Sequence, residues 1–504
     1  MIDRAPLAHR VDAALEPDPR RVVFRLFLPG EETRRGQSRV GAVVARVLAL
    51  DDDEVEECAA RLREDFWSQQ EDVAQVVDQN ALVAATHVAD ARLISPARRL
   101  VMGAALTAGY AVEAAALCNP SAFPHPDQSG LADGQTRVAV SVRGIGEGHI
   151  SSIEFVSAVV GPGAAWTFEP RAVPAVAGTV VDAPWQSDHL RALLEDAGRV
   201  DDLAYNVLAL LPDVFISAHL EAALQQVHTH LLAQTDADET IATLRRLVAS
   251  VYDVRFPDGV QLSQQVLMPY AAEESNGMED ARFVLFTDDD GTTDYRATYT
   301  AFDGRAISPR LLTSPDLHHF SAGRLTGPAA LNKGMALFPC RINGRYWAMS
   351  RTDGESNCVA SSTDGVMWGE PVVLQTPAET WELVQIGNCG PPIRTDRGWL
   401  VLTHGVGPMR QYSIGALLLD LDDPTRVVGR LRRPLLVPEP NSRSGYVPNV
   451  VYSCGGMLHG STLVLPYGCN DATIRMALIS LEPLLAELVA SPDGETDRTS
   501  EETP

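Results

Sequence analysis

Short apolar runs recur along most of the chain, and each ends at a small, charged or hydroxyl residue. Five of them are RVAVSVRG (137–144), RFVLFTD (282–288), GRYWAMSR (344–351), GWLVLTHG (398–405) and TLVLPYG (462–468). Runs of this length, separated by turns rich in Gly, Pro and Asp, are typical of buried β-strands. The last four recur at a spacing between 50 and 70 residues. Repeated strand-centred units predict an all-β core and favour a five-bladed β-propeller. A pair of β-sandwiches is the alternative that this periodicity leaves open.

Two stretches have helical periodicity instead. Residues 51–66 open with DDDEVEE, and Val55, Ala59, Leu62 and Phe66 then recur at helical spacing. Acidic residues at a helix start suit the helix dipole, so this segment predicts an amphipathic helix. A second helical block covers about 190–250, where Leu220 and Leu224 belong to one of two apolar stripes.

These patterns predict three parts of the chain. Residues 1–95 form an N-terminal extension of mixed and helical structure, and residues 96–485 form the β-rich catalytic domain, interrupted by the helical insertion at about 190–250. Residues 486–504 are expected to form a disordered tail, because its main part, SPDGETDRTSEETP (491–504), is polar and acidic and lacks an apolar anchor.

Composition narrows the classes of function. The 504 residues are 45% apolar and 21% charged, as in a globular protein. A net charge of −25 repels phosphate backbones, so we expect no nucleic-acid partner. No apolar signal core opens the chain, and the Ala/Gly-rich run 100–118 reads as a buried segment, so we expect no membrane association. Seven scattered cysteines without a CxxC motif indicate reduced thiols and a cytoplasmic location.

The segment NGMEDARF (276–283) carries two adjacent carboxylates, Glu279 and Asp280, just after Gly277. Neighbouring side chains of an extended segment point to opposite faces, so one carboxylate is expected in a cavity and the other in a structural role. A secluded carboxyl has a raised pKa and can act as a general acid. An ion pair between Glu279 and Arg282 in a turn is the simpler interpretation of the same residues.

Basic residues follow successive predicted strands. Lys333, in LNKGMALFP, is the only lysine of the chain, and the other 40 of the 41 basic residues are arginines. Arg351 ends the next strand and His404 the one after it, with Arg410 and Tyr412 close behind. If the strands converge, these side chains make an anion pocket inside an acidic protein. Taken one at a time, each basic residue is also explained as an ordinary surface charge.

Further polar residues are candidates for binding a polyhydroxylated ligand. Asn119 lies in CNPS, Arg143 in VSVRG and His149 in EGHISSIEF, and Asp471 follows the last predicted strand in PYGCND. Asparagine and aspartate at such positions are also common in turns. No convincing glycine-rich nucleotide loop or metalloprotease motif is present.

Several of these motifs together resemble glycoside hydrolase family 130, the inverting β-mannoside phosphorylases and related β-mannosidases. The resemblance spans roughly 100–485 and rests on NGMEDARF, KGMALFPCRINGRYWAMSR, GPPIRTDRGWLVLTHGV, YSIGALLLDLDDPTRVVGR with PLLVPEP, VPNVVYSCG and YGCND. Ala281 stands where the family usually has proline, which removes a turn restraint but no reactive group.

The resemblance implies a five-bladed propeller and an assignment of roles. Asp280 is the implied proton donor, acting through a hydroxyl of the sugar, while phosphate attacks the anomeric carbon and gives α-mannose 1-phosphate. Lys333, Arg351 and His404, with Tyr412, match the phosphate-binding positions. The mannosyl-binding positions are Asn119, Arg143 and Asp471, and Glu279 and Arg282 are assigned to substrate binding with them.

Phosphorolysis is therefore the main hypothesis, with a mannoside oligosaccharide and inorganic phosphate as the two substrates and no metal or other cofactor. An inverting β-mannosidase is the runner-up, and its base could be Glu382 or Glu439. A non-catalytic carbohydrate-binding propeller is the third hypothesis. The resemblance also implies a homo-oligomer, and the helical additions serve either as an oligomer surface or as a lid over the acceptor site.

Overall fold

The computed structural model describes residues 7–29, 38–67, 73–88, 90, 94–232, 235–440 and 445–490. They divide into two compact units. The larger unit comprises the described residues of Met1–Pro17, Ala115–Arg171 and Gly178–Pro504, and the smaller unit comprises those of Asp18–Ala114 and Ala172–Ala177.

The smaller unit is a set of helices with a β-hairpin. Its elements are α1 (Arg39–Ala49), α2 (Asp52–Leu62), α3 (Val73–Ala85), α4 (Pro96–Ala105), β2 (Val22–Leu26), β3 (Thr107–Ala111) and β8 (Val176–Ala177). The predicted helix at 51–66 is confirmed: Asp51 and Glu54 form a capping box at its start, and a π-helical turn, Arg63–Trp67, continues it. Val40, Val44 and Val55 belong to the unit's apolar core.

The boundary of this unit differs from the predicted extension 1–95. Strand β1 (Ala8–Leu15) pairs with a C-terminal strand of the larger unit, so the first residues do not belong to the appendage. At the other end, α4 contacts α3 and β3 pairs with β2, which carries the unit on to Ala114. Local hydrophobic periodicity could not reveal either pairing, because the paired segments are far apart in sequence.

The larger unit has an all-β core, as predicted. One sheet has the order β4–β5–β6–β14–β15–β16–β17–β12–β9, with β7 and β13 beside β6. Its strands are β4 (Ala116–Pro124), β5 (Thr136–Ile145), β6 (Ser151–Val160), β7 (Trp166–Phe168), β9 (Thr179–Asp182), β12 (Tyr252–Arg255), β13 (Gln265–Leu267), β14 (Gly277–Thr287), β15 (Thr293–Phe302), β16 (Ile307–Ser314) and β17 (His319–Arg324). Strands β6 and β14 meet only through a parallel pair between Ser151 and Gly277.

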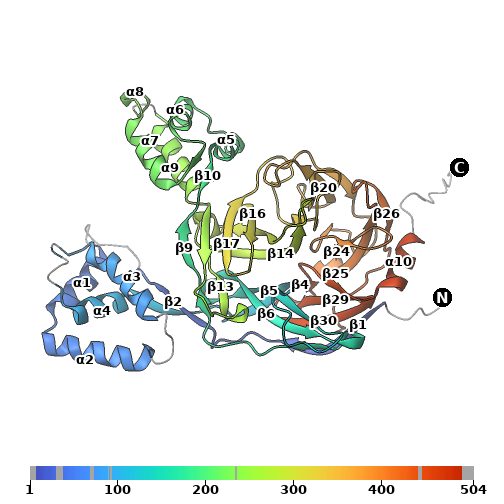
Figure 1. The fold of residues 1–504 in the computed structure, drawn as a ribbon, viewed down its shortest axis with the longest axis horizontal. Coiled ribbons are helices and arrows are strands. Elements are labelled where there is room, and N and C mark those ends of the chain that lie inside the picture. Colours follow the sequence, from blue (N-terminus) through green and yellow to red (C-terminus); the bar gives the residue numbers. More distant parts are fainter. Residues whose placement is uncertain are drawn as a thin grey trace. The chain divides into compact units, whose positions relative to one another are not determined.

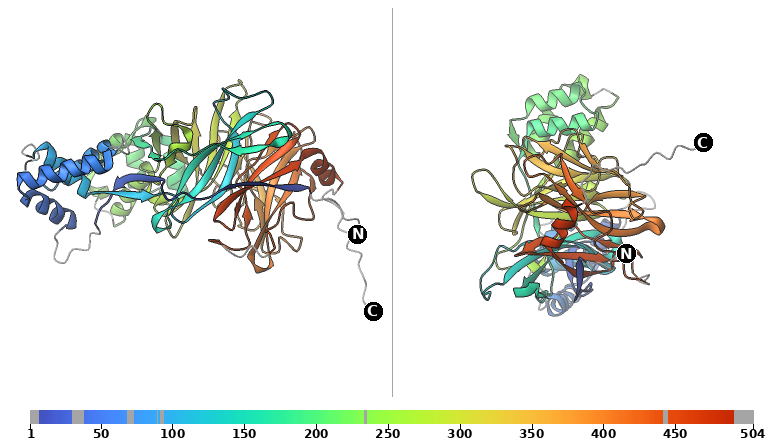
Figure 2. Two further views of the ribbon diagram at one scale, coloured as in Figure 1. Left: turned by 90° about the horizontal axis from the view of Figure 1, so that it is seen from below. Right: turned by 90° about the vertical axis from the view of Figure 1, so that its right-hand side faces the viewer.

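Three further antiparallel sheets follow along the chain (Figure 1). The first contains β18 (Ala336–Leu337), β19 (Tyr346–Ser350), β20 (Asn357–Ser362) and β21 (Val372–Gln375). The second contains β22 (Gln385–Asn388), β23 (Ile393–Arg394), β24 (Trp399–Gly407), β25 (Gln411–Leu419) and β26 (Val427–Arg430). The third joins β1 to β27 (Val451–Tyr452), β28 (Met457–His459), β29 (Thr462–Cys469) and β30 (Thr473–Ser480), and Figures 1 and 2 show the blue β1 beside these red strands.

Each of the five apolar runs noted in the sequence is a strand: β5, β14, β19, β24 and β29. Their side chains supply the buried core, as Val140, Leu402 and Leu465 do. The predicted strand positions are therefore confirmed.

The helical stretch predicted at about 190–250 is also helical in the structure. It contains α5 (Ser187–Asp196), α6 (Asp202–Leu210), α7 (Ser217–Gln226), α8 (Thr229–Leu232) and α9 (Ala237–Val248), with the short strands β10 (Trp185–Gln186) and β11 (Val214–Phe215). These helices have a core of their own around Trp185, Leu203 and Leu244. Figure 1 shows them gathered as one group.

The predicted disordered tail begins too early. Helix α10 (Leu481–Val489) runs past 486, because Leu484, Leu485 and Leu488 recur at helical spacing and bury themselves in the apolar core of the neighbouring sheets. Residues 491–504 lie outside the described residues. No helix in the described part of the chain is long and apolar enough to cross a membrane.

Candidate active site

One polar cavity of about 210 Å³ collects side chains from all four large sheets of the larger unit. It is lined by Asn119, Arg143, Asp280, Lys333, Arg351, Gln385, His404, Arg410, Tyr412, Val447, Val450, Tyr452 and Asp471. Eight of the ten residues assigned to the site from the sequence line it, although they span more than 350 positions of the chain. The two that do not line it are Glu279 and Arg282.

The backbone at three of these positions lies in the left-handed region. Asn119 has φ 51°, Asp280 has φ 56° and Asp471 has φ 48°. The first two sit at register shifts, where β4 bulges against β5 and β14 bulges against β15. Non-glycine residues in this region are uncommon and asparagine and aspartate tolerate it best, so each bulge turns a short polar side chain toward the cavity.

As expected, one of the two adjacent carboxylates, Asp280, lines the cavity and the other, Glu279, does not, but the bulge changes the geometry behind this expectation. Glu279 and Asp280 were expected on opposite faces, but both accept hydrogen bonds from Arg143, with Nη2 2.7 Å from Glu279 Oε1 and Nη1 3.4 Å from Asp280 Oδ1. The alternation of side chains holds only for regular extended backbone, and the positive φ of Asp280 breaks it.

Asp280 is held as an anion. Burial favours its neutral form, but Arg143, Arg282 and Lys333 together outweigh burial, and Asn119 Nδ2 donates to Oδ1, so the pKa of Asp280 lies below its ordinary value. The expectation that a secluded position raises this pKa is therefore wrong for the protein without substrate. Seclusion also gathers arginines around the carboxylate, and their charges decide the direction.

Glu279 lies behind the cavity wall, with 7% of its side chain exposed. Its carboxylate bridges two cations, because Lys333 Nζ lies 2.6 Å from Oε2 while Arg143 holds Oε1. The predicted direct contact with substrate is thus replaced by contacts with two residues that do line the cavity.

Arg282 is also placed behind the cavity, and 2% of its side chain is exposed. Its guanidinium donates to the backbone oxygen of Cys389 at 2.8 Å, to that of Asp280 at 2.8 Å and to the hydroxyl of Tyr452 at 2.9 Å. These hydrogen bonds hold the strand that carries Asp280 against the neighbouring sheets, so Arg282 stabilises the position of Asp280 without lining the cavity.

Besides Arg143, the cations that line the cavity are Lys333, Arg351 and Arg410. Lys333 precedes β18, Arg351 follows β19 and Arg410 precedes β25. Gly387 leaves the room that Arg351 and His404 occupy, since a Cβ there would lie 2.6 Å from the His404 ring and 2.9 Å from Arg351 Cδ. The prediction that basic residues of successive strands meet is confirmed by this placement.

His404 is not one of the cations. Its Nδ1 faces the backbone oxygen of Asn388 at 3.2 Å, and its Nε2 faces Arg351 Nη1 at 2.9 Å. Arg351 can only donate, so Nε2 accepts and Nδ1 carries the proton. Burial and the adjacent Arg351 charge lower the pKa of His404 well below its ordinary value. The expected trio of cations therefore becomes two cations and a neutral acceptor that orients one of them.

Two further polar groups of the cavity are the Asp471 carboxyl, which has a shifted pKa, and the Asn119 amide, which has an oxygen left unpaired within the described part of the chain. Burial, with the nearby charge of Asp280, raises the pKa of Asp471 to about 6. Asn119 is 8% exposed, and its Oδ1 has no hydrogen-bond partner among the described residues. A buried acceptor without a partner is costly, so this oxygen is a position where a ligand hydroxyl would be bound favourably.

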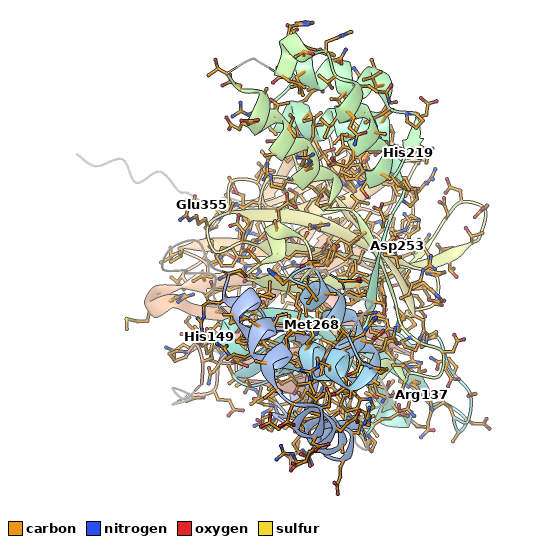
Figure 3. All side chains as sticks on the ribbon, turned by 90° about the vertical axis from the view of Figure 1, so that its left-hand side faces the viewer. Arg137, His149, His219, Asp253, Met268 and Glu355 are labelled. Carbon is orange, nitrogen blue, oxygen red and sulfur yellow. The ribbon has the colours of Figure 1, made fainter. Side chains whose placement is uncertain are left out.

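Sequence reasoning named some residues without giving them a role and missed others. Arg410 was named among the basic residues of the predicted anion pocket, Tyr452 lay inside the quoted VPNVVYSCG, and Gln385 carried no signal, since a lone glutamine after a loop has none. Tyr452 supports the site by accepting from Arg282 and packing edge-on against His404, with ring centroids 4.9 Å apart. His149, labelled in Figure 3, meets Tyr446 at 3.2 Å instead of lining the cavity.

The two carboxylates considered as hydrolytic bases do not line the cavity. Glu382 is fully buried elsewhere and accepts from the backbone N–H groups of Ala378 and Glu379. Glu439 is exposed and pairs with Arg10 at 3.6 Å. Within the described residues, Asp280 and Asp471 are the carboxylates that line it. No three metal-ligating side chains converge anywhere in that part of the chain.

Two carboxylates in one polar cavity are an arrangement that glycoside-processing enzymes use. The comparisons narrow this class. The model of glycoside hydrolase family 130, described as β-1,4-mannooligosaccharide phosphorylase, matches residues 242–489. The 1,2-β-oligomannan phosphorylase of Thermoanaerobacter sp. (strain X514) is 34% identical over 45% of this chain and 77% of the relative. The β-1,2-mannobiose phosphorylase of the same organism is 33% identical over 47% of this chain and 79% of the relative. The chain belongs to glycoside hydrolase family 130.

Among solved structures, the β-1,2-mannobiose phosphorylase from Listeria innocua in complex with β-1,2-mannobiose matches with a TM-score of 0.44 and 21% identity. The match covers 76% of this chain and 94% of that one.

Proposed function

We propose that the protein is an inverting β-mannoside phosphorylase. It cleaves the β-mannosidic bond of a mannobiose, a longer manno-oligosaccharide or a mannosyl-glucose with inorganic phosphate, and its products are α-mannose 1-phosphate and the shortened sugar. The relatives named above act, by their names, on β-1,2-linked mannosides, and others are named β-1,4-mannooligosaccharide phosphorylase and 4-O-β-D-mannosyl-D-glucose phosphorylase.

One observation carries the choice of phosphorolysis. The cavity that holds Asp280 also holds Lys333, Arg351 and Arg410, and Arg351 is aimed by a neutral His404. Inverting hydrolysis needs a second carboxylate that stays ionised to activate water. Asp471 is the other carboxylate in the cavity, and a pKa of about 6 leaves it ionised at pH 7, so it does not decide between the two reactions. The cations do, because phosphate brings its own negative charge and needs them, whereas water does not.

In the proposed reaction, the Asp280 carboxylic acid donates its proton toward the glycosidic oxygen while a phosphate oxygen bonds to the anomeric carbon from the opposite face. The carbon–oxygen bond to the leaving sugar breaks, and the configuration inverts. Asn119, Arg143 and Asp471 are proposed to bind the mannosyl unit. Lys333, Arg351 and Tyr412 are proposed to bind phosphate.

The ionised state of Asp280 in the free protein fits this scheme. Phosphate bound at Lys333 and Arg351 adds negative charge beside the cations that hold Asp280 ionised. Its pKa then rises, so phosphate binding helps to load the proton that the reaction uses. Asp280 is therefore expected to be protonated in the ternary complex rather than in the free protein.

The core is proposed to be a five-bladed propeller. Five antiparallel groups follow one another along the chain: β4–β6, β14–β17, β18–β21, β22–β26 and β27–β30 with β1. The single bridge between β6 and β14 fits two blades in contact rather than one continuous sheet. A homo-oligomer without metal or organic cofactor, located in the cytoplasm, belongs to the same proposal.

The test is to incubate the protein with β-1,2- and β-1,4-mannobiose, with and without phosphate, and to follow α-mannose 1-phosphate by phosphorus NMR. Phosphate-dependent formation of this product supports the proposal. Turnover unchanged without phosphate would establish the hydrolase, and binding of mannosides without turnover would establish the non-catalytic reading. An acceptor screen in the reverse direction, with α-mannose 1-phosphate as donor, then determines the linkage.

A further inference from the structure

We propose that Glu279 is a positioning residue that holds the phosphate-binding lysine and the sugar-binding arginine in one arrangement. The inference rests on the proposed function, and it assigns Glu279 a role through its neighbours rather than through contact with substrate.

The carboxylate of Glu279 bridges two cationic side chains. Oε2 lies 2.6 Å from Lys333 Nζ and Oε1 lies 2.7 Å from Arg143 Nη2. The carboxylate is almost fully buried and does not line the cavity, whereas both of its partners do. Charge-assisted hydrogen bonds of this length are strong, so the two cations are tied to one buried point.

Lys333 needs such an anchor. Its side chain is 36% exposed, its stem is flexible, and Glu279 is its one carboxylate partner within the described residues. Ordering a lysine side chain costs conformational entropy. Because the ion pair with Glu279 already orders Lys333 in the free protein, phosphate binding does not lose that entropy again. An ammonium group has three donors, and the bond to Glu279 uses one, so two remain for phosphate oxygens.

The other half of the bridge reaches the proton donor. Arg143 donates one hydrogen bond from Nη2 to Glu279 and another from Nη1 to Asp280, and the second measures 3.4 Å. Its Nε is buried and has no hydrogen-bond partner among the described residues, so these two carboxylates fix the guanidinium plane. Movement of Glu279 would therefore be transmitted to both ends of the cavity.

This arrangement also favours lysine over arginine at position 333. A guanidinium opposite a carboxylate forms a planar two-pronged pair, which fixes the directions of its remaining donors, whereas an ammonium group can rotate its two free donors toward phosphate. In a chain with 40 arginines and one lysine, the lysine stands where a point charge has to serve two anions. We expect Lys333→Arg to keep the ion pair and still raise the KM for phosphate at least fivefold.

The decisive experiment is a double-mutant cycle between Glu279→Gln and Lys333→Ala, with phosphate KM, mannoside KM and kcat measured for all four proteins. The amide of Gln keeps the shape but presents a donor to a cation, so we expect the phosphate KM to rise at least tenfold in the wild-type background. In the Lys333→Ala background the same change should alter the phosphate KM less than twofold, because the residue it acts through is gone.

Equal factors in both backgrounds, or a phosphate KM that stays constant or falls in Glu279→Gln, would overturn the proposal. Should Glu279→Gln fail to fold, Glu279→Asp is measured in the same two backgrounds, because the shorter carboxylate keeps the charge but cannot reach both cations. Restoration of a wild-type phosphate KM by Asp would also overturn it.

Glu273→Gln is the matched control. Glu273 is a buried glutamate of the same unit that also bridges two cations, with Arg324 Nη1 at 2.6 Å and Arg310 Nη1 at 3.5 Å, but unlike the partners of Glu279 these arginines do not line the cavity. A purely structural effect would lower the Tm in both variants and leave phosphate KM unchanged in both. If the wild-type protein turns over equally without phosphate, both this inference and the proposed function fail. If its turnover needs phosphate and the cycle is additive, only the role of Glu279 fails.

Discussion

Asp280→Asn isolates the proposed proton transfer from every other property of the site. Asparagine tolerates the φ of 56° at this position, so the bulge in β14 is kept. The amide oxygen can still accept from Asn119 Nδ2, and the side chain has nearly the same volume. The change therefore removes the ionisable proton and the negative charge and leaves the shape of the cavity.

The expected loss is large and falls on kcat. A positioned general acid contributes about 10²- to 10⁴-fold in rate, which corresponds to roughly 3–5 kcal/mol of the barrier. Lys333 and Arg351 are still present to bind phosphate, so the KM for phosphate should change by less than threefold. The Tm should stay within about 3 °C, because Arg143 and Arg282 keep their bonds to Glu279 and to backbone oxygens.

The assay compares two leaving groups. With mannobiose the leaving alkoxide needs the proton, so Asp280→Asn should lose at least a hundredfold in kcat. With an activated aryl β-mannoside the leaving group is stable as an anion, and the loss should shrink to about tenfold or less. The matched control is Asp471→Asn, the same chemical change at a second cavity position with positive φ, where the two substrates should lose equally.

Retention of more than a tenth of the wild-type kcat with mannobiose would refute Asp280 as the acid. An equal loss with both leaving groups would refute it as well, because the variant would then act through sugar binding rather than through protonation.

Three further outcomes are expected. Lys333→Ala should raise the phosphate KM at least tenfold and leave the mannoside KM within threefold in steady-state assays. His404→Phe keeps a ring beside Tyr452 but leaves Arg351 Nη1 without its acceptor, so phosphate KM should rise about tenfold, with no change in the mannoside KM. The pKa of Asp471, raised to about 6, means that this carboxyl stabilises the fold below pH 4 and that the contribution is lost as pH rises through 6. Asp471→Asn should therefore gain at most about 3 kcal/mol in urea unfolding at pH 7, and the gain should shrink toward pH 5.

The placement of the site residues followed from the sequence, because short motifs after apolar runs stay attached to strand ends. Asn119 and Arg143 lie within β4 and β5, Lys333 precedes β18 and Asp471 follows β29, and all four line the cavity. Successive sheets meet around a shared space, and the resemblance to the family selected these residues from the many polar positions of the chain, which residue type and position alone did not.

The protonation states did not follow from the sequence. That Asp280 is ionised depends on the approach of Arg143 and Arg282, and that His404 is neutral depends on Arg351 Nη1 standing 2.9 Å from its Nε2. Arg282 is only two positions from Asp280, but Arg143 is 137 positions away from it and Arg351 is 53 positions from His404, and no local pattern contains these two contacts. The two predictions about charge that were wrong, a raised pKa for Asp280 and a cationic His404, both concern such long-range contacts.

The strained backbone of the cavity connects the fold to the chemistry. Asn119, Asp280 and Asp471 each hold a conformation that costs about 1–2 kcal/mol for an ordinary L-residue, and they come from strands or turns of two different sheets. Neither β4 nor β14 needs a bulge to pair with its neighbour, since the register is regular on both sides. What the bulges achieve is to place Asn119 Nδ2 against Asp280 Oδ1 and to bring Glu279 and Asp280 onto one arginine. Bulges that bring together an acid, its hydrogen-bond donor and a cation are explained by the reaction proposed for those groups.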